Sequence, residues 1–325
     1  MYDADEFVKS VPLGIDQKLG ELPYDVARKE LYTAADLFDV FDPKDPSSME
    51  RCLDARIAAH LDQTGRIRPT ELELYARTMH DAHIRAALYR LLNWYEEKKV
   101  VGIMGGHALL RTDAYYRRVV EVAKALTERG MLMISGGGPG AMEATHVGAW
   151  LAGRPTADVD RALAMLSAAP SCEDARWLAT AFDVMQAFPQ QKGFVSVSVP
   201  TWYFSSEPPT PFANYIAKFF ENSLREDLLL SESYGGLVFM PGGAGTLQEI
   251  FQDAMQNHYV TLGYPSPMVF VGRSFWTETM PVYPLLEHLI AQGRYKNIDA
   301  SLVETAEEIL AAFDHPTAYE SRTPA

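Results

Sequence analysis

The sequence has little cysteine and no long apolar run. Its 325 residues include only Cys52 and Cys172, which excludes a disulfide framework and a thiolate metal cluster. No stretch approaches the roughly 20 apolar residues that a membrane-spanning helix needs. Residues 1–17 carry several acidic side chains and no apolar run, unlike a signal peptide. We therefore expect a cytoplasmic protein with no membrane partner.

Basic residues are also scarce. Lys and Arg number 29 against 43 Asp and Glu, which gives a net charge of −14. This balance disfavours nucleic acid and anionic membranes as partners, so any phosphate site has to be local. The HExxH zinc motif, the GxSxG nucleophile elbow and the Walker A loop are absent too. We therefore expect no bound metal and no hydrolase triad.

Residues 1–98 have mainly helical patterns. Met49, Leu53, Ile57 and Leu61 recur at steps of four, which places them on one helix face. A second helical run covers residues 70–98. We therefore expect an N-terminal helical layer in front of the rest of the chain.

From residue 99 the pattern alternates between strands and helices. Apolar strands are expected at 99–104, 131–135, 194–199, 236–240 and 268–271, and helices at 113–129, 141–152, 214–230, 246–259 and 275–292. Strands that are apolar on both faces and alternate with helices indicate a doubly wound parallel sheet of the α/β, Rossmann-like class. We assign 99–315 to this domain, with a helical insertion or lid at about 158–190 and a tail at 316–325.

The strand at 236–240 leads into the sequence PGGAGTLQE at 241–249. Glycines let backbone N–H groups approach a ligand closely, and the helix that follows directs its positive dipole end at the same point. This predicts a phosphate site made by Gly242, Gly243, Gly245 and Thr246. Glu249 follows on the first turn of the helix, beside the predicted phosphate.

A second glycine turn, GGGPGA at 136–141, loosely matches the dinucleotide fingerprint G-x-G-x-x-A. It follows the second strand of the domain, and the acidic residues about 20 positions on, Asp158 and Asp160, lie in a polar segment. A nicotinamide site is therefore disfavoured. A phosphate or ribose contact is favoured over a tight packing turn without a ligand.

Three further features each have two interpretations. His107, in the turn GGH at 105–107, is either a plain loop histidine or part of the same crevice. Arg225 either pairs with Glu226 and Asp227 on a solvated face or serves the site. The proline loop EPPTP at 207–211 is either a connector or a stiff wall.

Together these motifs resemble the LOG-like family of Rossmann-fold nucleotide phosphoribohydrolases, formerly mislabelled lysine decarboxylases. Residues 241–249 match the family pattern P-G-G-x-G-T-x-x-E throughout, and Arg225 falls where the family keeps an arginine. The turns at 105–107 and 138–144 and the proline loop at 207–211 are more similar to the bacterial nucleotide 5′-monophosphate nucleosidases than to the plant cytokinin-activating enzymes. The resemblance covers about residues 99–295.

The resemblance implies hydrolysis of the N-glycosidic bond of a nucleoside 5′-monophosphate to a free base and ribose 5-phosphate, without a cofactor. Glu249 suits the stabilisation of positive charge on the ribose and the activation of water, and Arg225 is catalytic in the family. Gly137, Gly138 and Met142 are implied to wall the ribose and base. Glu143 either contacts the ribose or base or is a helix-start carboxylate favoured by the dipole. A homodimer or a multiple of it is also implied.

Two features depart from the family pattern. The insertion at 158–190 is longer and more helical than the family leads us to expect, and the C-terminal region of the larger bacterial nucleosidases is not matched. A different class of function uses the same fold: a non-catalytic carrier of a nucleotide or phosphorylated cofactor. The presence of both Arg225 and Glu249 favours the enzyme, because a carrier does not need that pair.

Overall fold

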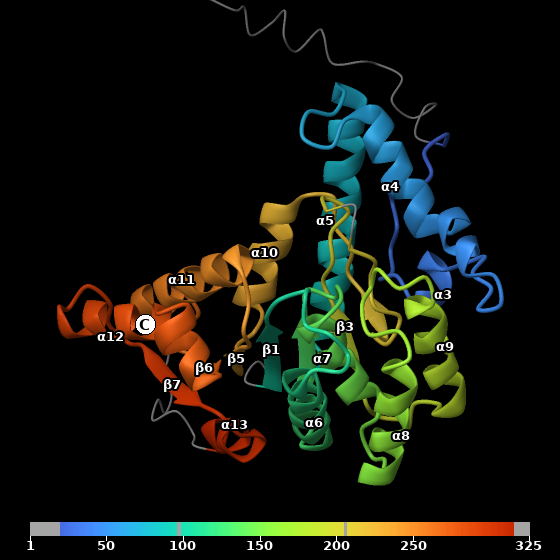
Figure 1. Cartoon of the computed structure of the whole chain (residues 1–325). Coiled ribbons are helices and arrows are strands. Elements are labelled where there is room, and N and C mark those ends of the chain that lie inside the picture. Colours follow the sequence, from blue (N-terminus) through green and yellow to red (C-terminus); the bar gives the residue numbers. More distant parts are fainter. Residues whose placement is uncertain (1–19, 96–98, 205–206, 315–325) are drawn as a thin grey trace, which may run out of the picture.

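A computed structural model describes residues 20–95, 99–204 and 207–314. Its centre is a seven-stranded sheet in the order β4-β3-β2-β1-β5-β6-β7, with every pair parallel (Figure 1). The strands are β1 (Val100–Met104), β2 (Leu132–Ser135), β3 (Ser196–Ser198), β4 (Tyr215–Ile216), β5 (Gly236–Phe239), β6 (Pro267–Val271) and β7 (Asp299–Val303). This confirms the predicted doubly wound parallel sheet.

The chain order of the strands creates one switch point. The chain runs outward from β1 through β2 and β3 to β4, then returns to place β5 on the other side of β1. In sheets of this kind the ligand crevice lies outside the carboxyl ends of the strands at such a switch point. The crevice is therefore expected where β1 and β5 end.

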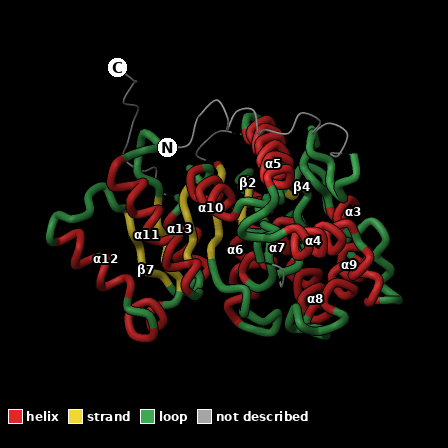
Figure 2. The backbone as a smooth tube through the Cα atoms, turned by 90° about the horizontal axis from the view of Figure 1, so that it is seen from above, coloured by secondary structure: helices red, strands yellow, loops and turns green. Residues whose placement is uncertain are grey.

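Successive residues of each strand pack into two separate cores, one on each face of the sheet. Val101, Ile103, Met133 and Val238 pack with α6 (Ala114–Glu128), α7 (Ala141–Trp150) and α13 (Ala306–Ala312). Their neighbours in sequence pack on the opposite face with α10 (Asn222–Ser231), α11 (Ala244–Tyr259) and α12 (Val282–Ala291). Side chains alternate across a strand, so helices on both faces require strands that are apolar throughout. Figure 2 shows the strands enclosed by helices.

The N-terminal helices are α3 (Ala34–Leu37), the 3-10 helix η1 (Pro46–Arg51), α4 (Leu53–Thr64) and α5 (Glu71–Leu92). Their buried residues, including Ile57, Leu61, Ile84 and Leu88, join the core on the α10 face of the sheet. α5 also caps α10, because the carboxylate of Asp81 accepts from the N–H groups of Phe220 (3.0 Å) and Glu221 (2.9 Å). The N-terminal layer thus supports the helix that carries Arg225.

Residues 158–190 contain most of two helices, α8 (Thr156–Leu166) and α9 (Trp177–Ala187), which lie side by side (Figure 1). Buried residues of α8 such as Leu163 and Leu166 extend the core of α6 and α7. In the described part of the chain, no helix combines the length and apolar character needed to cross a bilayer.

Two predicted helices were partly wrong. Within 214–230, residues 215–216 form β4, which pairs with β3, and α10 begins only at Asn222. Within 275–292, a π-helix (η3, Phe275–Thr279) is separated from α12 by Pro281, which is the N-cap of α12 and cannot donate a helical hydrogen bond.

β7 and α13 lie outside the predicted elements. β7 lies at the edge of the sheet and is only partly buried, so it lacks the apolar run of the inner strands. α13 has a capping box, in which Thr305 and Glu308 satisfy each other's backbone N–H groups.

Candidate active site

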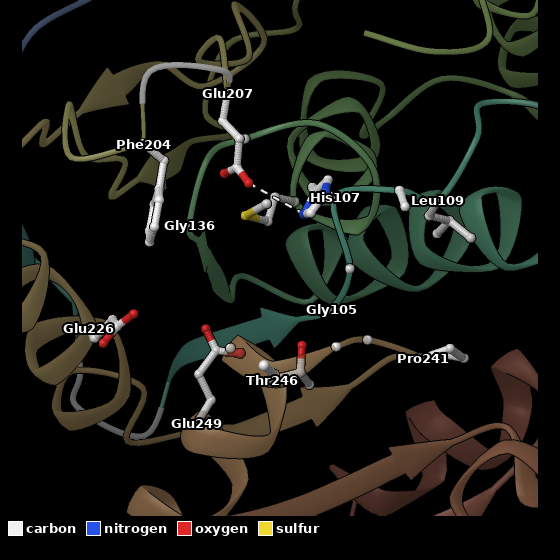
Figure 3. Close-up of a pocket in the computed structure, with 18 of the residues that line it drawn as sticks. Gly105, His107, Leu109, Gly136, Phe204, Glu207, Glu226, Pro241, Thr246 and Glu249 are labelled. Atoms are coloured by element: carbon white, nitrogen blue, oxygen red, sulfur yellow. Dashed lines mark ion pairs between the residues drawn. The ribbon is translucent and has the colours of Figure 1, made fainter. Parts of the chain in front are cut away.

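A cleft of about 790 Å³ lies at the switch point, where the turns after β1, β2 and β5 meet (Figure 3). The turns after β1 and β5 are joined by backbone hydrogen bonds from Met240 to Met104 (2.8 Å) and from Gly106 to Pro241 (3.1 Å). The lining includes Gly105, Gly106, His107, Asp113, Gly136, Gly138, Met142, Thr201, Phe204, Glu207, Arg225, Glu226, Pro241, Gly242, Gly243, Gly245, Thr246, Glu249 and Phe275.

The glycine turn after β5 opens directly into α11. The N–H groups of the first helical turn have no intrahelical partner, and the N-cap residue Gly243 has no side chain to accept from them. The helix dipole adds a partial positive charge at the same point. Free N–H groups and a partial positive charge thus meet on the floor of the cleft, an arrangement that can bind an anion.

The protein itself does not require glycine at two of these positions. A Cβ built on Gly243 or Gly245 would meet nothing within 4 Å, and neither residue has a left-handed φ. Gly242 differs, because a Cβ there would lie 2.2 Å from Oγ1 of Thr246. Gly242 thus allows the Thr246 side chain to pack, whereas Gly243 and Gly245 leave space above the helix N-terminus.

Glu249 lies on α11 with its half-buried carboxyl group directed into the cleft (Figure 3). Burial raises the pKa of Glu249 from 4.5 to about 7, because desolvation outweighs the opposing attraction of Arg225, and the negative charge of Glu226 adds to the rise. A carboxyl group with a pKa near neutrality can both hold and accept a proton at physiological pH.

Arg225 reaches the same cleft from α10. Its Nη2 donates to Oδ1 of Asn222 (2.9 Å) and lies 3.5 Å from Glu226 Oε1, while its Nε is buried without a partner. Nη1 lies close to Gly136, at 3.1 Å from where a Cβ would be. No ion pair joins Arg225 to Glu249 within the described residues, so Arg225 acts on Glu249 through space.

The turn after β2 supplies Gly136, Gly138 and Met142 to the lining. Gly137 does not line the cleft: it is buried, its φ is +71°, and a Cβ would lie 2.5 Å from Cβ of Ser198. Its glycine is therefore required by the turn.

Glu143 does not line the cleft either. It is fully buried in the first turn of α7, where its carboxylate accepts from Arg111 Nε (2.9 Å), Arg111 Nη2 (2.5 Å) and Tyr116 Oη (2.9 Å). Arg111 also donates to the α8–α9 region at Thr180 Oγ1 (2.8 Å). The expected contact of Glu143 with a ribose or base is thus replaced by a buried ion pair.

His107 lies on the cleft, one of the two interpretations that the sequence left open, whereas several other lining residues had no predicted role. His107 Nδ1 lies 3.3 Å from Glu207 Oε1, an ion pair that joins the turn after β1 to the proline loop. Phe204 and Phe275 lie on the lining without any motif that marks them, while Glu226 had been considered only as a solvated partner of Arg225. Adjacency to Arg225 was the signal available for Glu226.

No group of three or more His, Cys, Asp and Glu side chains in residues 20–95, 99–204 and 207–314 could hold a metal ion.

No family model and no curated protein matches the sequence. Among solved structures, a molybdenum cofactor binding protein from Rippkaea orientalis aligns with 66% of this chain and 94% of its own, at 11% identity and a TM-score of 0.40. A structural-genomics protein designated TM1055 aligns with 66% of this chain and 98% of its own, at 16% identity and a TM-score of 0.41. Likenesses this distant do not bear on the function.

Proposed function

We propose that the protein hydrolyses the N-glycosidic bond of a nucleoside 5′-monophosphate, giving a free base and ribose 5-phosphate. The observation that carries the proposal is the placement of Glu249, with its pKa near 7, on the helix whose open N-terminus forms the anion site. A phosphate bound at that N-terminus would hold the attached ribose beside the carboxyl group. Catalysis would then depend on positioning.

The charges of the cleft favour a single phosphate group. The anion site consists of backbone N–H groups from Gly243 onward and the Thr246 hydroxyl, without a lysine on the lining. Further phosphates would meet the carboxylates of Asp113, Glu207 and Glu226 on the same lining. A monophosphate therefore fits this distribution better than a di- or triphosphate.

The proposed mechanism follows from how the bond breaks. Loss of the base leaves positive charge on C1′ and the ring oxygen of the ribose. The ionised carboxylate of Glu249 stabilises that charge and accepts a proton from the attacking water. Arg225 lines the cleft with its Nη2 held by Asn222, and its guanidinium contacts the substrate. Gly138 and Met142 bound the ribose.

We also propose that two copies associate through α11. Leu247, Phe251, Met255 and Tyr259 recur at steps of four, which makes one stripe along the helix. Met255 is 40% and Tyr259 70% exposed. Light scattering should give a dimer mass, and Tyr259→Glu should shift it toward the monomer. A wild-type monomer at all concentrations would contradict the dimer.

A carrier of a larger phosphorylated ligand is the second candidate. The observation in its favour is the size of the cleft, about 790 Å³, whose lining includes both Phe204 and Phe275 beside the glycine turn. The presence of an acid–base group at Glu249 favours the enzyme.

Measuring the release of free base distinguishes the hydrolase from the carrier. AMP, GMP, IMP, CMP and UMP are incubated separately with the protein, alongside their nucleosides, and free base and ribose 5-phosphate are measured. We expect release from at least one monophosphate, none from its nucleoside, and loss of activity in Glu249→Gln. Binding of a nucleotide without release would support the carrier.

A further inference from the structure

The hydrolysis requires a proton donor that Glu249 does not supply. When the C1′–N bond breaks, its electron pair moves to the base, and a ring nitrogen of the base has to be protonated for departure to be easy. In glycoside hydrolysis the group that assists departure and the carboxylate that handles the water lie on opposite faces of the sugar. A donor is therefore sought across the cleft from Glu249.

We propose that His107 protonates the leaving base and that Glu207 positions it for this task. The proposal rests on the function proposed above. His107 belongs to the turn after β1 and Glu207 to the loop that follows β3, so neither is on α11. Figure 3 shows the pair on the wall that faces Glu249 across the open part of the cleft.

Glu207 gives the imidazole an acidic neighbour on one side. Glu207 Oε1 lies 3.3 Å from His107 Nδ1, and its Oε2 lies against Gly138, at 3.2 Å from where a Cβ would be. Both residues line the cleft, and their side chains are 63% (His107) and 29% (Glu207) exposed. A carboxylate on one ring nitrogen orients a histidine and stabilises the imidazolium, while the other nitrogen, Nε2, carries the proton to be transferred.

Charged and titratable groups surround this pair on both sides. Those on the shared cleft are Asp113, Arg225, Glu226 and Glu249, and those on an adjoining cavity of about 180 Å³ behind His107 are Arg111, Glu143, Cys172 and Glu173. Arg111 is neutralised by its ion pair with Glu143. Carboxylates thus dominate the field around His107.

Nε2 of His107 gives its proton to a ring nitrogen of the base while the C1′–N bond breaks and its electrons pass to the base. Water adds to C1′, and its proton goes to Glu249. After the products leave, Glu249 returns a proton to solvent and His107 takes one up. The net reaction consumes one water and no other reactant.

Dependence on the leaving group tests the proposal. The substrates are the purine monophosphate that the wild type hydrolyses and its N7-methylated derivative, whose base departs without protonation. We expect His107→Gln to lower kcat/KM about 10²- to 10⁴-fold for the first, the usual contribution of a general acid, and by less than about tenfold for the second. His83→Gln, on α5 and outside the cleft, is the matched control. An equal loss on both substrates would overturn the proposal.

The pH profile of kcat/KM gives a second readout, which can be measured whether or not the substrate is a purine nucleotide. For the wild type, kcat/KM should fall at high pH as the acid loses its proton, and His107→Gln should lack this fall. Glu207→Gln should retain it and should lower kcat/KM more for the unmethylated purine monophosphate than for its N7-methylated derivative. An unchanged alkaline fall in His107→Gln would overturn the assignment while leaving the proposed function intact, whereas a wild type that releases no base would overturn both.

Discussion

Arg111 holds Glu143 through two parallel hydrogen bonds, from Nε (2.9 Å) and from Nη2 (2.5 Å), and both side chains are buried. Arg111 precedes α6 and Glu143 lies on α7, so the pair joins the turn after β1 to the helix that follows β2. The Tyr116 hydroxyl also donates to Glu143. Glu143 therefore stabilises the scaffold beneath the cleft.

This pair predicts a change in stability without a change in substrate binding. Glu143→Gln leaves Arg111 buried without a countercharge, which should lower the free energy of unfolding by about 3–5 kcal/mol. Denaturant titration measures this. Glu121→Gln, which breaks the exposed Arg117–Glu121 pair, should cost at most about 0.5 kcal/mol. A stable Glu143→Gln variant with a strongly raised KM would instead place Glu143 at the substrate.

The raised pKa of Glu249 predicts the acid limb of the activity profile. Because Glu249 has to be ionised to stabilise the ribose cation, kcat/KM should rise with pH through about 7. Glu226 contributes to the raised pKa, so Glu226→Gln should move this limb to lower pH. Ionisation of the substrate phosphate also contributes near pH 6, but Glu226→Gln would not move that. If Glu226→Gln left the acid limb of the profile unchanged, that limb would not report the ionisation of Glu249.

The same group predicts how stability varies with pH. The folded protein holds the Glu249 proton up to about pH 7, whereas the unfolded chain releases it near 4.5. Between these values the native state binds more protons, so its free energy of unfolding should fall as pH rises. Thermal unfolding at several pH values should show a flatter dependence in Glu249→Gln. An equally steep dependence would contradict the raised pKa.

Gly245 predicts opposite effects on stability and binding. Alanine at this position in the first turn of α11 meets nothing within 4 Å, so Gly245→Ala should raise the free energy of unfolding by about 0.5–1 kcal/mol. The added methyl group occupies the space above the anion site, and KM for the monophosphate should rise about tenfold or more, which corresponds to about 1.4 kcal/mol. Gly20→Ala, also in open space, is the control. An unchanged KM would show that the substrate phosphate does not bind at this turn.

The contacts of Asp54 predict that the N-terminal helices position one wall of the cleft. Its Oδ1 accepts from the buried ammonium of Lys218 (2.5 Å) and from Trp202 Nε1 (2.8 Å), and Trp202 leads into the loop that carries Phe204. Asp54→Asn should therefore lower the free energy of unfolding by about 3 kcal/mol. It should also raise KM and alter the fluorescence of Trp202.

Arg56→Gln is the matched variant on the same helix. It breaks the more exposed pair with Asp39 and an exposed hydrogen bond to the Arg51 carbonyl, so it should cost less than about 1 kcal/mol and leave KM unchanged. If Asp54→Asn lost stability but kept its KM, the N-terminal helices would support the fold without positioning the cleft wall.

The inner strands could be predicted from the sequence because burial on both faces forces continuous apolar runs such as 236–240. β4 and β7 could not. β4 is two residues long and half of it, Tyr215, is exposed, while β7 is a partly buried edge strand. Tertiary pairing with β3 and β6 decides their conformation.

A similar division applies to the cleft. The turn at 241–249 could be recognised because its glycines, Thr246 and Glu249 are neighbours in sequence. The remaining relationships join distant positions: Arg111 and Glu143 are 32 residues apart and Asp54 and Lys218 are 164 apart. Nothing in a single sequence specifies such pairings. His107 and Glu207 were recognisable as features of two turns, but their contact required the fold.

The most direct test of the central claim is the number of base molecules released per protein molecule. The protein is incubated with an excess of each nucleoside 5′-monophosphate, and free base, ribose 5-phosphate and intact bound nucleotide are quantified together. The account predicts many equivalents of base with an equal amount of ribose 5-phosphate from at least one nucleotide. Recovery of one equivalent of intact bound nucleotide, with no base released from any of them, would contradict it.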